Sequence, residues 1–365
     1  MTKIVSVLMA MILSACSNVS IINNDTQVRK ENKTEAKEVV SESTVYESKN
    51  ESIGDTKTQQ DKVINEKDIL PKEYITKTEE NSPAVKEYCD KTNEYFAKYN
   101  WGKSHCHDFT WHHVRDSYWG NPIAWYVFGN EEETEHQNVT LIMCGVHGDE
   151  ITPIKFCYDL MMDLKSNPQI IGDNLIIIAP LVTPDSFFRK KPTRTNARGV
   201  DINRNFPTQD WAKNAIKLWK TRYGSDKRRF PGKYALSEQE TIFSVNIINL
   251  YKPQKIISVH APLTLLDYDG PSFSQSEGKA AKQLLVQMSN KAGKYKISNY
   301  PFFTGSLGNW AGNERNIPTY TLELPNSDWN KTDTYYKMFR TALHHAIQDN
   351  LSYSEKETKS QTLNQ

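Results

Sequence analysis

The fold of this 365-residue chain is constrained most by two short, almost uninterrupted apolar segments and by a third segment that we expect to form another buried strand. The first two are residues 139–144 and 174–179, and the third is residues 255–260. Segments of this kind are typical of strands that are buried on both faces, as in a parallel sheet. Residues 152–164 and 237–250, which lie between them, have the apolar spacing of helices that pack on such a sheet. This alternation predicts an α/β domain with a doubly wound, mostly parallel mixed sheet and helices on both faces.

Weaker patterns extend the folded region in both directions. Residues 87–99 have a weak helical pattern, and residues 111–129 have the pattern of two strands that turn at Gly120-Asn121-Pro122. Ser237-Glu238-Gln239-Glu240 has the residue types of a capping box, which predicts a helix start at Ser237. We therefore expect three parts: an N-terminal extension at residues 81–109 that packs on the domain, the domain itself at residues 110–351, and a polar tail at residues 352–365.

The first sixteen residues have the pattern of an export signal. Lys3 precedes an apolar stretch at residues 4–13 that is too short to span a bilayer as a stable helix. The stretch ends in Leu13-Ser14-Ala15-Cys16, which resembles the lipobox of bacterial lipoproteins. That resemblance implies lipidation of Cys16, and Ser17 after it favours the outer membrane. The alternative is an ordinary cleavage site that a cysteine happens to follow.

Residues 17–80 differ in composition from the rest of the chain. Within residues 21–75 there are 12 acidic and 9 basic side chains, and no window has a sustained period of a strand or a helix. Such a segment buries too little apolar surface to offset the entropy of ordering it, so we expect a disordered polar tether. Because the formal net charge of the whole chain is only +1, nucleic acid is not an expected partner.

Candidate metal ligands follow two of the predicted strands. His147 and Glu150 come directly after residues 139–144, and His260 ends the strand predicted at residues 255–260. Two imidazoles and a carboxylate suit a catalytic Zn²⁺ ion, which takes three protein ligands and a water. His112 and His113 are a rival pair, but alternation along a strand would point them to opposite faces, so we expect a structural role for them.

The order of these residues and of several longer motifs resembles the zinc carboxypeptidase family. The matching motifs are Gly199-Val200-Asp201-Ile202-Asn203-Arg204-Asn205-Phe206-Pro207, Gly305-Ser306-Leu307-Gly308-Asn309-Trp310 and Thr321-Leu322-Glu323-Leu324-Pro325. Within that family, residues 194–201 and 258–263 are most similar to the bacterial murein tripeptide amidases, which cut γ-D-glutamyl-diaminopimelate bonds.

The resemblance implies a role for each matching residue. One Zn²⁺ ion per chain would be held by the metal ligands His147, Glu150 and His260. Glu323 would be the general base that acts on the zinc-bound water, and Arg194 would stabilise the oxyanion. Asp201 would orient His147. The substrate would be bound by Asn203 and Arg204, which match the pair that grips its terminal carboxylate, and by Tyr300, which matches a mobile tyrosine by spacing alone.

For several other residues the sequence shows a departure from the family's pattern or leaves more than one role open. Asp149 stands where many digestive members of the family have an arginine, and Leu307 lies where members often set side-chain preference. Asp267 and Asp269 either meet the distal ammonium of diaminopimelate or belong to a solvated turn at Asp269-Gly270. Two cysteine interpretations remain: Cys89 and Cys106 are able to pair in an oxidising compartment, whereas Cys144 and Cys157 have the positions of small buried apolar side chains.

Together these features predict an exported, lipid-anchored zinc metallocarboxypeptidase. Its expected location is the outer membrane or periplasm, and its expected partners are peptidoglycan-derived peptides and a membrane, with the protein a monomer. The expected reaction is hydrolysis of the γ-D-glutamyl-meso-diaminopimelate bond of the murein tripeptide by a zinc-bound water. Two alternatives are an acyl-amino-acid hydrolase of the desuccinylase or aspartoacylase type, and a non-catalytic wall-binding lipoprotein.

Overall fold

The computed structural model of the chain describes residues 79–133 and 138–351. The predicted signal segment with Cys16, nearly all of the predicted tether and the predicted polar tail lie outside these residues. In the described ranges, no helix combines the length and the apolar character needed to cross a membrane.

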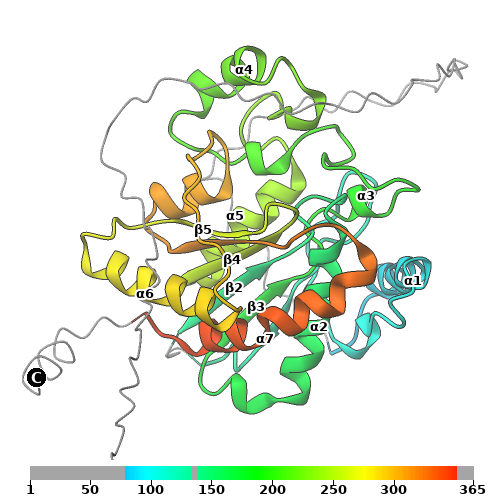
Figure 1. Cartoon of the computed structure of the whole chain (residues 1–365). Helices are drawn as coiled ribbons and strands as arrows, with labels where there is room; N and C mark the ends of the chain where they lie inside the picture. The colour runs from blue at the N-terminus through cyan, green and yellow to red at the C-terminus, as the bar shows by residue number, and fades with distance from the viewer. Residues whose placement is uncertain (1–78, 134–137, 352–365) are drawn as a thin grey trace, which may run out of the picture. The chain divides into compact units, whose positions relative to one another are not determined.

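A mixed sheet forms the centre of the folded region (Figure 1). It has six strands in the order β1-β3-β2-β4-β6-β5. The strands are β1 (Tyr126–Phe128), β2 (Val139–Met143), β3 (Leu175–Ala179), β4 (Lys255–His260), β5 (Leu265–Asp269) and β6 (Thr319–Glu323). β3, β2, β4 and β6 are parallel to one another, and β1 and β5 are antiparallel strands at the two edges. The predicted fold class is therefore confirmed.

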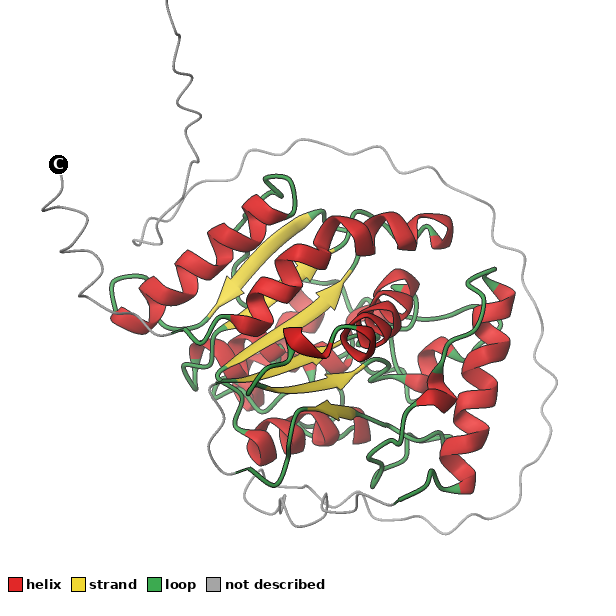
Figure 2. Ribbon diagram, turned by 90° about the horizontal axis from the view of Figure 1, so that it is seen from below, coloured by secondary structure: helices red, strands yellow, loops and turns green. Residues whose placement is uncertain are grey.

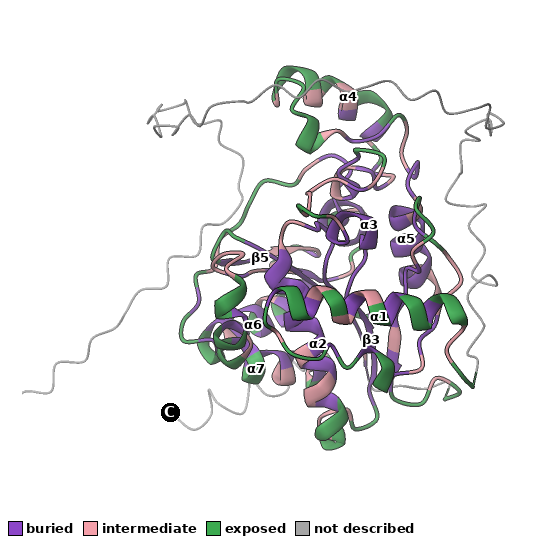
Figure 3. Cartoon of the chain, turned by 90° about the vertical axis from the view of Figure 1, so that its right-hand side faces the viewer, coloured by how far each residue is buried: buried purple, intermediate pink, exposed green. Residues whose placement is uncertain are grey.

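Helices cover both faces of this sheet (Figure 2). One face packs against α1 (Pro83–Lys98), α2 (Ile151–Ser166), α6 (Ser276–Lys291) and α7 (Thr332–Gln348). The other face packs against α5 (Gln239–Tyr251) and a π-helix at Gly308–Asn313. The short α3 (Pro184–Phe187) is buried, whereas α4 (Trp211–Thr221) buries only Trp211 and Ala215 and is half-buried or exposed elsewhere (Figure 3). Alternate residues of β4 enter the two apolar clusters, Ile257 and Val259 on the first face and Ile256 on the second, as strand geometry requires.

One local prediction was wrong, and a second was confirmed only in part. Helix α5 begins at Gln239, and Ser237 does not cap it, because the Ser237 hydroxyl donates to Glu238 and accepts from Asn205. Residues 111–129 double back at the predicted turn, with antiparallel bridges from His112 to Trp125 and from Asp116 to Pro122, but the one strand in this segment is the short β1, which pairs with β3. The turn packs on the buried Asp185, whose carboxylate accepts hydrogen bonds from Ser117 and Asn121.

Helix α1 precedes all the strands in the chain, and its buried side chains pack into the same apolar cluster as those of α2, α6 and α7. Ser82 caps the helix by accepting a hydrogen bond from the Val85 N–H, and Pro83 occupies its first turn. The Tyr88 hydroxyl lies 3.3 Å from that of Tyr158 in α2, and both side chains are buried. A disulfide from Cys89 to Cys106 ties α1 to the segment that follows it.

A second disulfide corrects the interpretation of Cys144 and Cys157 as unbonded apolar side chains. These cysteines are bonded to each other, with their Cα atoms 6.3 Å apart. Cys144 directly follows β2, and Cys157 lies on the face of α2 that packs back on the same strand end, so the fold brings them within bonding distance. Because residues 144–157 include His147 and Glu150, two of the candidate metal ligands lie within the loop that this disulfide closes.

Candidate metal centre and active site

The loop from β2 to α2 positions the first two candidate ligands. His147 is fully enclosed, and Glu150 directly precedes Ile151, the first residue of α2. Gly148 lies between them against the backbone of Ser186, where an added Cβ would lie 2.3 Å from the Ser186 carbonyl carbon. A side chain at this position would push the loop away, so the glycine allows the tight turn that brings the two ligands together.

The third ligand and the candidate base come from adjacent strands. His260 is the last residue of β4, Glu323 is the last residue of β6, and the two are register partners in the parallel ladder. Cross-strand partners point to the same face of a sheet. The side chains of His260 and Glu323 therefore emerge side by side at the carboxyl edge, which is where ligands bind in open α/β sheets.

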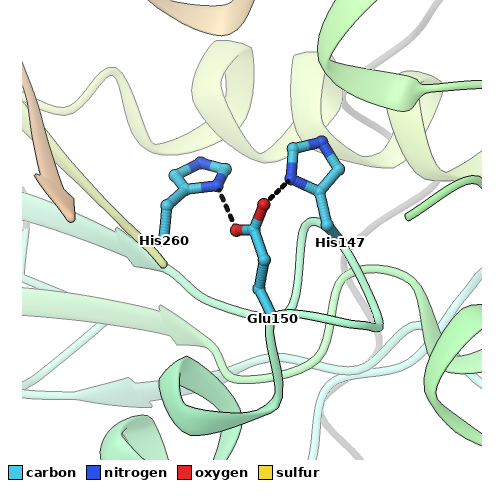
Figure 4. Close-up of side chains that lie close together, drawn as sticks. All are labelled: His147, Glu150 and His260. Atoms are coloured by element: carbon cyan, nitrogen blue, oxygen red, sulfur yellow. Dashed lines mark hydrogen bonds and ion pairs between the residues drawn. The ribbon is translucent and has the colours of Figure 1, made fainter. Parts of the chain in front are cut away.

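The Glu150 carboxylate lies between the two imidazoles (Figure 4). Its Oε1 is 2.8 Å from Nδ1 of His147, and its Oε2 is 2.9 Å from Nδ1 of His260. One donor atom from each residue lies within 4.8 Å of the other two, and this is the one such metal-ligating group in the described part of the chain. The structure thus brings together the three ligands that were predicted from separate segments.

The other ring nitrogens of both histidines are held by polar partners. Nε2 of His147 lies 3.0 Å from Oδ1 of Asp201, and Nε2 of His260 lies 2.9 Å from the Ser258 hydroxyl. These contacts fix each ring with Nδ1 toward Glu150, as expected for histidines that bind a metal through one nitrogen. Ser258 was not among the predicted residues, although its place two residues before His260 on β4 puts both side chains on one face.

The donor set fits a zinc ion. Burial raises the pKa of Glu150, but the two histidines outweigh that effect and lower it, so the carboxylate is ionised. Two imidazole nitrogens and one carboxylate oxygen, all buried and converging, match the three protein ligands of catalytic zinc sites. His112 and His113 are not part of this group: His112 stacks on Trp125, and His113 bonds to Asp116.

Arg194 and Glu323 lie next to the three ligands. Arg194 donates from Nε to Asp201 at 2.9 Å and from an Nη to Glu150 at 3.1 Å, so its guanidinium borders the metal position. The Glu323 carboxylate accepts the Leu263 N–H at 3.3 Å. Burial raises the pKa of Glu323, against the opposing influence of His260, which brings the group closer to the range in which a general base works near neutral pH.

The predicted substrate-binding residues lie on the segments beside this edge. The Asn203 side-chain oxygen accepts the Leu307 N–H at 2.8 Å. The Arg204 guanidinium stacks 4.3 Å from the centre of the Phe303 ring, and burial lowers its pKa. Tyr300 is 40% exposed, and its N–H donates to Asp267. Asp149, at the position of the family's frequent arginine, pairs instead with Arg228 at 2.9 Å.

The fold and the donor set define a zinc metallopeptidase, and comparison with protein families agrees. The chain belongs to the zinc carboxypeptidase family, whose profile matches residues 103–352. It is a peptide hydrolase, as predicted.

Two known proteins of similar sequence indicate which members of this family the chain resembles. Murein peptide amidase A of Vibrio campbellii is 29% identical over 209 residues, which cover 56% of this chain and 75% of that protein. Murein peptide amidase A of Escherichia coli K12 is 26% identical over 216 residues, which cover 58% of this chain and 80% of that protein. The predicted similarity to murein amidases within the family is therefore confirmed.

Among solved structures, carboxypeptidase A of Helicoverpa armigera has the same fold. The TM-score is 0.54 at 17% identity, and the match covers 66% of this chain and 68% of that one. At this identity the likeness concerns the fold alone.

Proposed function

We propose that this protein hydrolyses the γ-D-glutamyl-meso-diaminopimelate bond of the peptidoglycan tripeptide. The observation that carries the proposal is the convergence of His147, Glu150 and His260 beside Glu323 at one sheet edge, in a chain whose curated relatives are named murein peptide amidase A. A zinc ion held by these residues would act as a Lewis acid that lowers the pKa of water enough for it to give up a proton near neutral pH.

The chain's own residues supply the remaining steps. Glu323 takes the proton of the attacking water and later delivers it to the leaving amine, a transfer that its raised pKa favours. The Arg194 guanidinium faces the negative charge that develops on the carbonyl oxygen. Arg204 pairs with the free carboxylate of the residue that is released, since its fork of donors suits a carboxylate.

The pairing with Arg204 predicts a preference for the tripeptide over the tetrapeptide. In the tetrapeptide an added D-alanine blocks the carboxylate, which leaves Arg204 unpaired. Loss of one such charge-assisted contact costs about 2–5 kcal/mol, so we expect kcat/KM for L-Ala-γ-D-Glu-meso-diaminopimelate to exceed that for the tetrapeptide by about 30-fold or more. Chromatography of the released products with both peptides in one assay measures the ratio.

The Arg204→Gln variant tests the role of Arg204 directly, because it should remove the preference for the tripeptide over the tetrapeptide. Equal rates on both peptides with the unaltered protein would contradict the role of Arg204. Cleavage of N-succinylglutamate with no cleavage of the tripeptide would instead point to an acyl-amino-acid hydrolase.

We further propose that the protein is exported and held at a membrane by a lipid on Cys16. The sequence of residues 1–16 is the basis of this proposal, and the two disulfides support it, because disulfides persist in oxidising compartments. We expect the full chain produced in bacteria to enter the detergent phase in a Triton X-114 separation. The Cys16→Ala variant should stay in the aqueous phase, whereas Ser17→Ala should behave like the unaltered chain. Recovery of the unaltered chain from the aqueous phase would refute the lipid anchor.

A further inference from the structure

Two acidic side chains of β5 share a sheet face with Glu323. In the antiparallel ladder between β5 and β6, Asp267 is the partner of Thr321, and Leu265 is the partner of Glu323. Side chains two residues apart on a strand point to the same face. Asp267, Asp269 and Glu323 therefore all point to the face that the π-helix Gly308–Asn313 covers. With a rise of about 3.3 Å per residue, Asp267 lies about 7 Å along the sheet from the row of Glu323.

Asp267 is buried, and no cationic side chain of the described residues pairs with it. Its side chain is 8% exposed, and Oδ1 accepts the N–H groups of Tyr268 and Tyr300 at 2.9 and 3.1 Å. Among the described residues, no lysine, arginine or histidine forms an ion pair with it, and its Oδ2 has no hydrogen-bond donor. Burial above all, and the neighbouring Asp269 next, raise the pKa of Asp267 to about 7. A carboxylate in this environment gains from a cationic partner that arrives with a ligand.

The second acid is held in place by the π-helix. Asp269 accepts a hydrogen bond from the Asn313 amide at 2.8 Å. A Cβ at Gly308 would lie 2.0 Å from Oδ2 of Asp269, and a Cβ at Gly312 would lie 2.7 Å from its Cβ. These two glycines therefore leave the room that the Asp269 carboxylate occupies behind Asp267.

Space remains above this part of the sheet. Thr321 lies between β4 and β5 in an internal strand, yet it keeps partial exposure, as does Glu323. Tyr320 and Leu322, on the opposite face of the same strand, are fully buried. The face that carries Glu323, Thr321 and Asp267 is therefore accessible from the reaction centre, whereas the opposite face is closed by packed helices.

We propose that Asp267, supported by Asp269, binds the side-chain ammonium group of the amino acid that the reaction releases. This inference rests on the proposed function and deepens it, because it assigns the recognition of a diamino acid to two residues of β5. A long diamino side chain that extends from the scissile bond near Glu323 spans the distance to Asp267. The ammonium group then supplies a counter-charge that no described residue provides, and a side chain without an amine leaves Asp267 buried without that partner.

A pair of substrates that differ only in the amine tests the proposal. One is L-Ala-γ-D-Glu-meso-diaminopimelate, and the other carries 2-aminopimelate, which has the same carbon chain and distal carboxylate but no side-chain amine. We expect the unaltered protein to favour the diamino substrate, and Asp267→Asn to lower kcat/KM for it by about 30-fold or more, as for removal of one partner of a buried charge pair. For the 2-aminopimelate substrate, the same variant should change kcat/KM less than about threefold or raise it.

Two further variants separate recognition from structure. Asp269→Asn should have a smaller effect with the same substrate dependence, and Asp116→Asn, at an exposed aspartate outside the site, should have none. Zinc content and thermal unfolding of each variant show whether the fold is kept. An equal loss on both substrates in Asp267→Asn, or no preference for the amine in the unaltered protein, would overturn the assignment.

A binding measurement keeps the inference independent of turnover. Calorimetry with the zinc-loaded Glu323→Gln protein should show tighter binding of free meso-diaminopimelate than of 2-aminopimelate. The double variant Glu323→Gln with Asp267→Asn should lose that preference. Absence of hydrolysis by the unaltered protein would contradict the proposed function alone, and this binding comparison would then decide the role of Asp267 by itself.

Discussion

The Glu323→Gln variant is expected to retain its fold and its zinc but to lose nearly all turnover of the tripeptide. An amide has almost the size of the carboxylate, but it cannot accept the proton of the attacking water. General acid–base catalysis by one group contributes about 10²–10⁴-fold, and Glu323 serves both the attack and the departure of the amine, so the loss should reach at least the upper part of that range. Steady-state kinetics and metal analysis of the same preparation measure both quantities.

The matched control for this variant is Glu87→Gln, at an exposed position of α1. It should have the zinc content and the turnover of the unaltered protein. Turnover within about tenfold of normal in Glu323→Gln would mean that a different group takes the proton, since a general base contributes more than that.

Replacing His147 should remove most of the bound metal. Loss of a residue that only orients a ligand lowers metal affinity by about 10–100-fold, and loss of a ligand itself should exceed this. His147→Ala also leaves Glu150 and Asp201 without the imidazole that contacts both carboxylates. We expect a substoichiometric zinc content after dialysis and a fall in turnover of the same proportion or greater.

His113→Ala provides the control, because His113 bonds to Asp116 outside the metal-ligating group. Its zinc content should be unchanged. Stoichiometric zinc in a variant that lacks both His147 and His260 would contradict the proposed ligand set.

The apolar segments allowed the centre of the fold to be predicted from the sequence. Residues 139–144 and 174–179 lie in the buried centre of a parallel sheet that helices cover on both faces, so most of their side chains are apolar and their pattern is clear. The edge strand β5 was not predicted as a strand, because its sequence places Asp267 and Asp269 at alternate positions near a glycine. That pattern is equally typical of a turn.

The metal ligands were predictable for a similar reason. His147 and Glu150 are close in sequence, and His260 ends a recognisable strand, so strand topology alone brings the three together. The contacts around them depend on information that single segments do not contain. The Ser258 contact requires the face of β4, and the Cys144–Cys157 bond requires the packing of α2 on β2. The side-chain environment of Asp267 requires the register of β5 on β6.

The register of β6 between β4 and β5 decides which face of the sheet the Glu323 side chain points to. Glu323 is flanked by Leu322 and Leu324, which are both fully buried among the apolar side chains of the opposite layer. A slip or an inserted residue in β6 would exchange these faces, because the side-chain period of a strand is two. The carboxylate would then enter an apolar layer, and a leucine would face the metal. A change of one residue in the length of β6 would therefore abolish the site, even in a chain that keeps every catalytic residue.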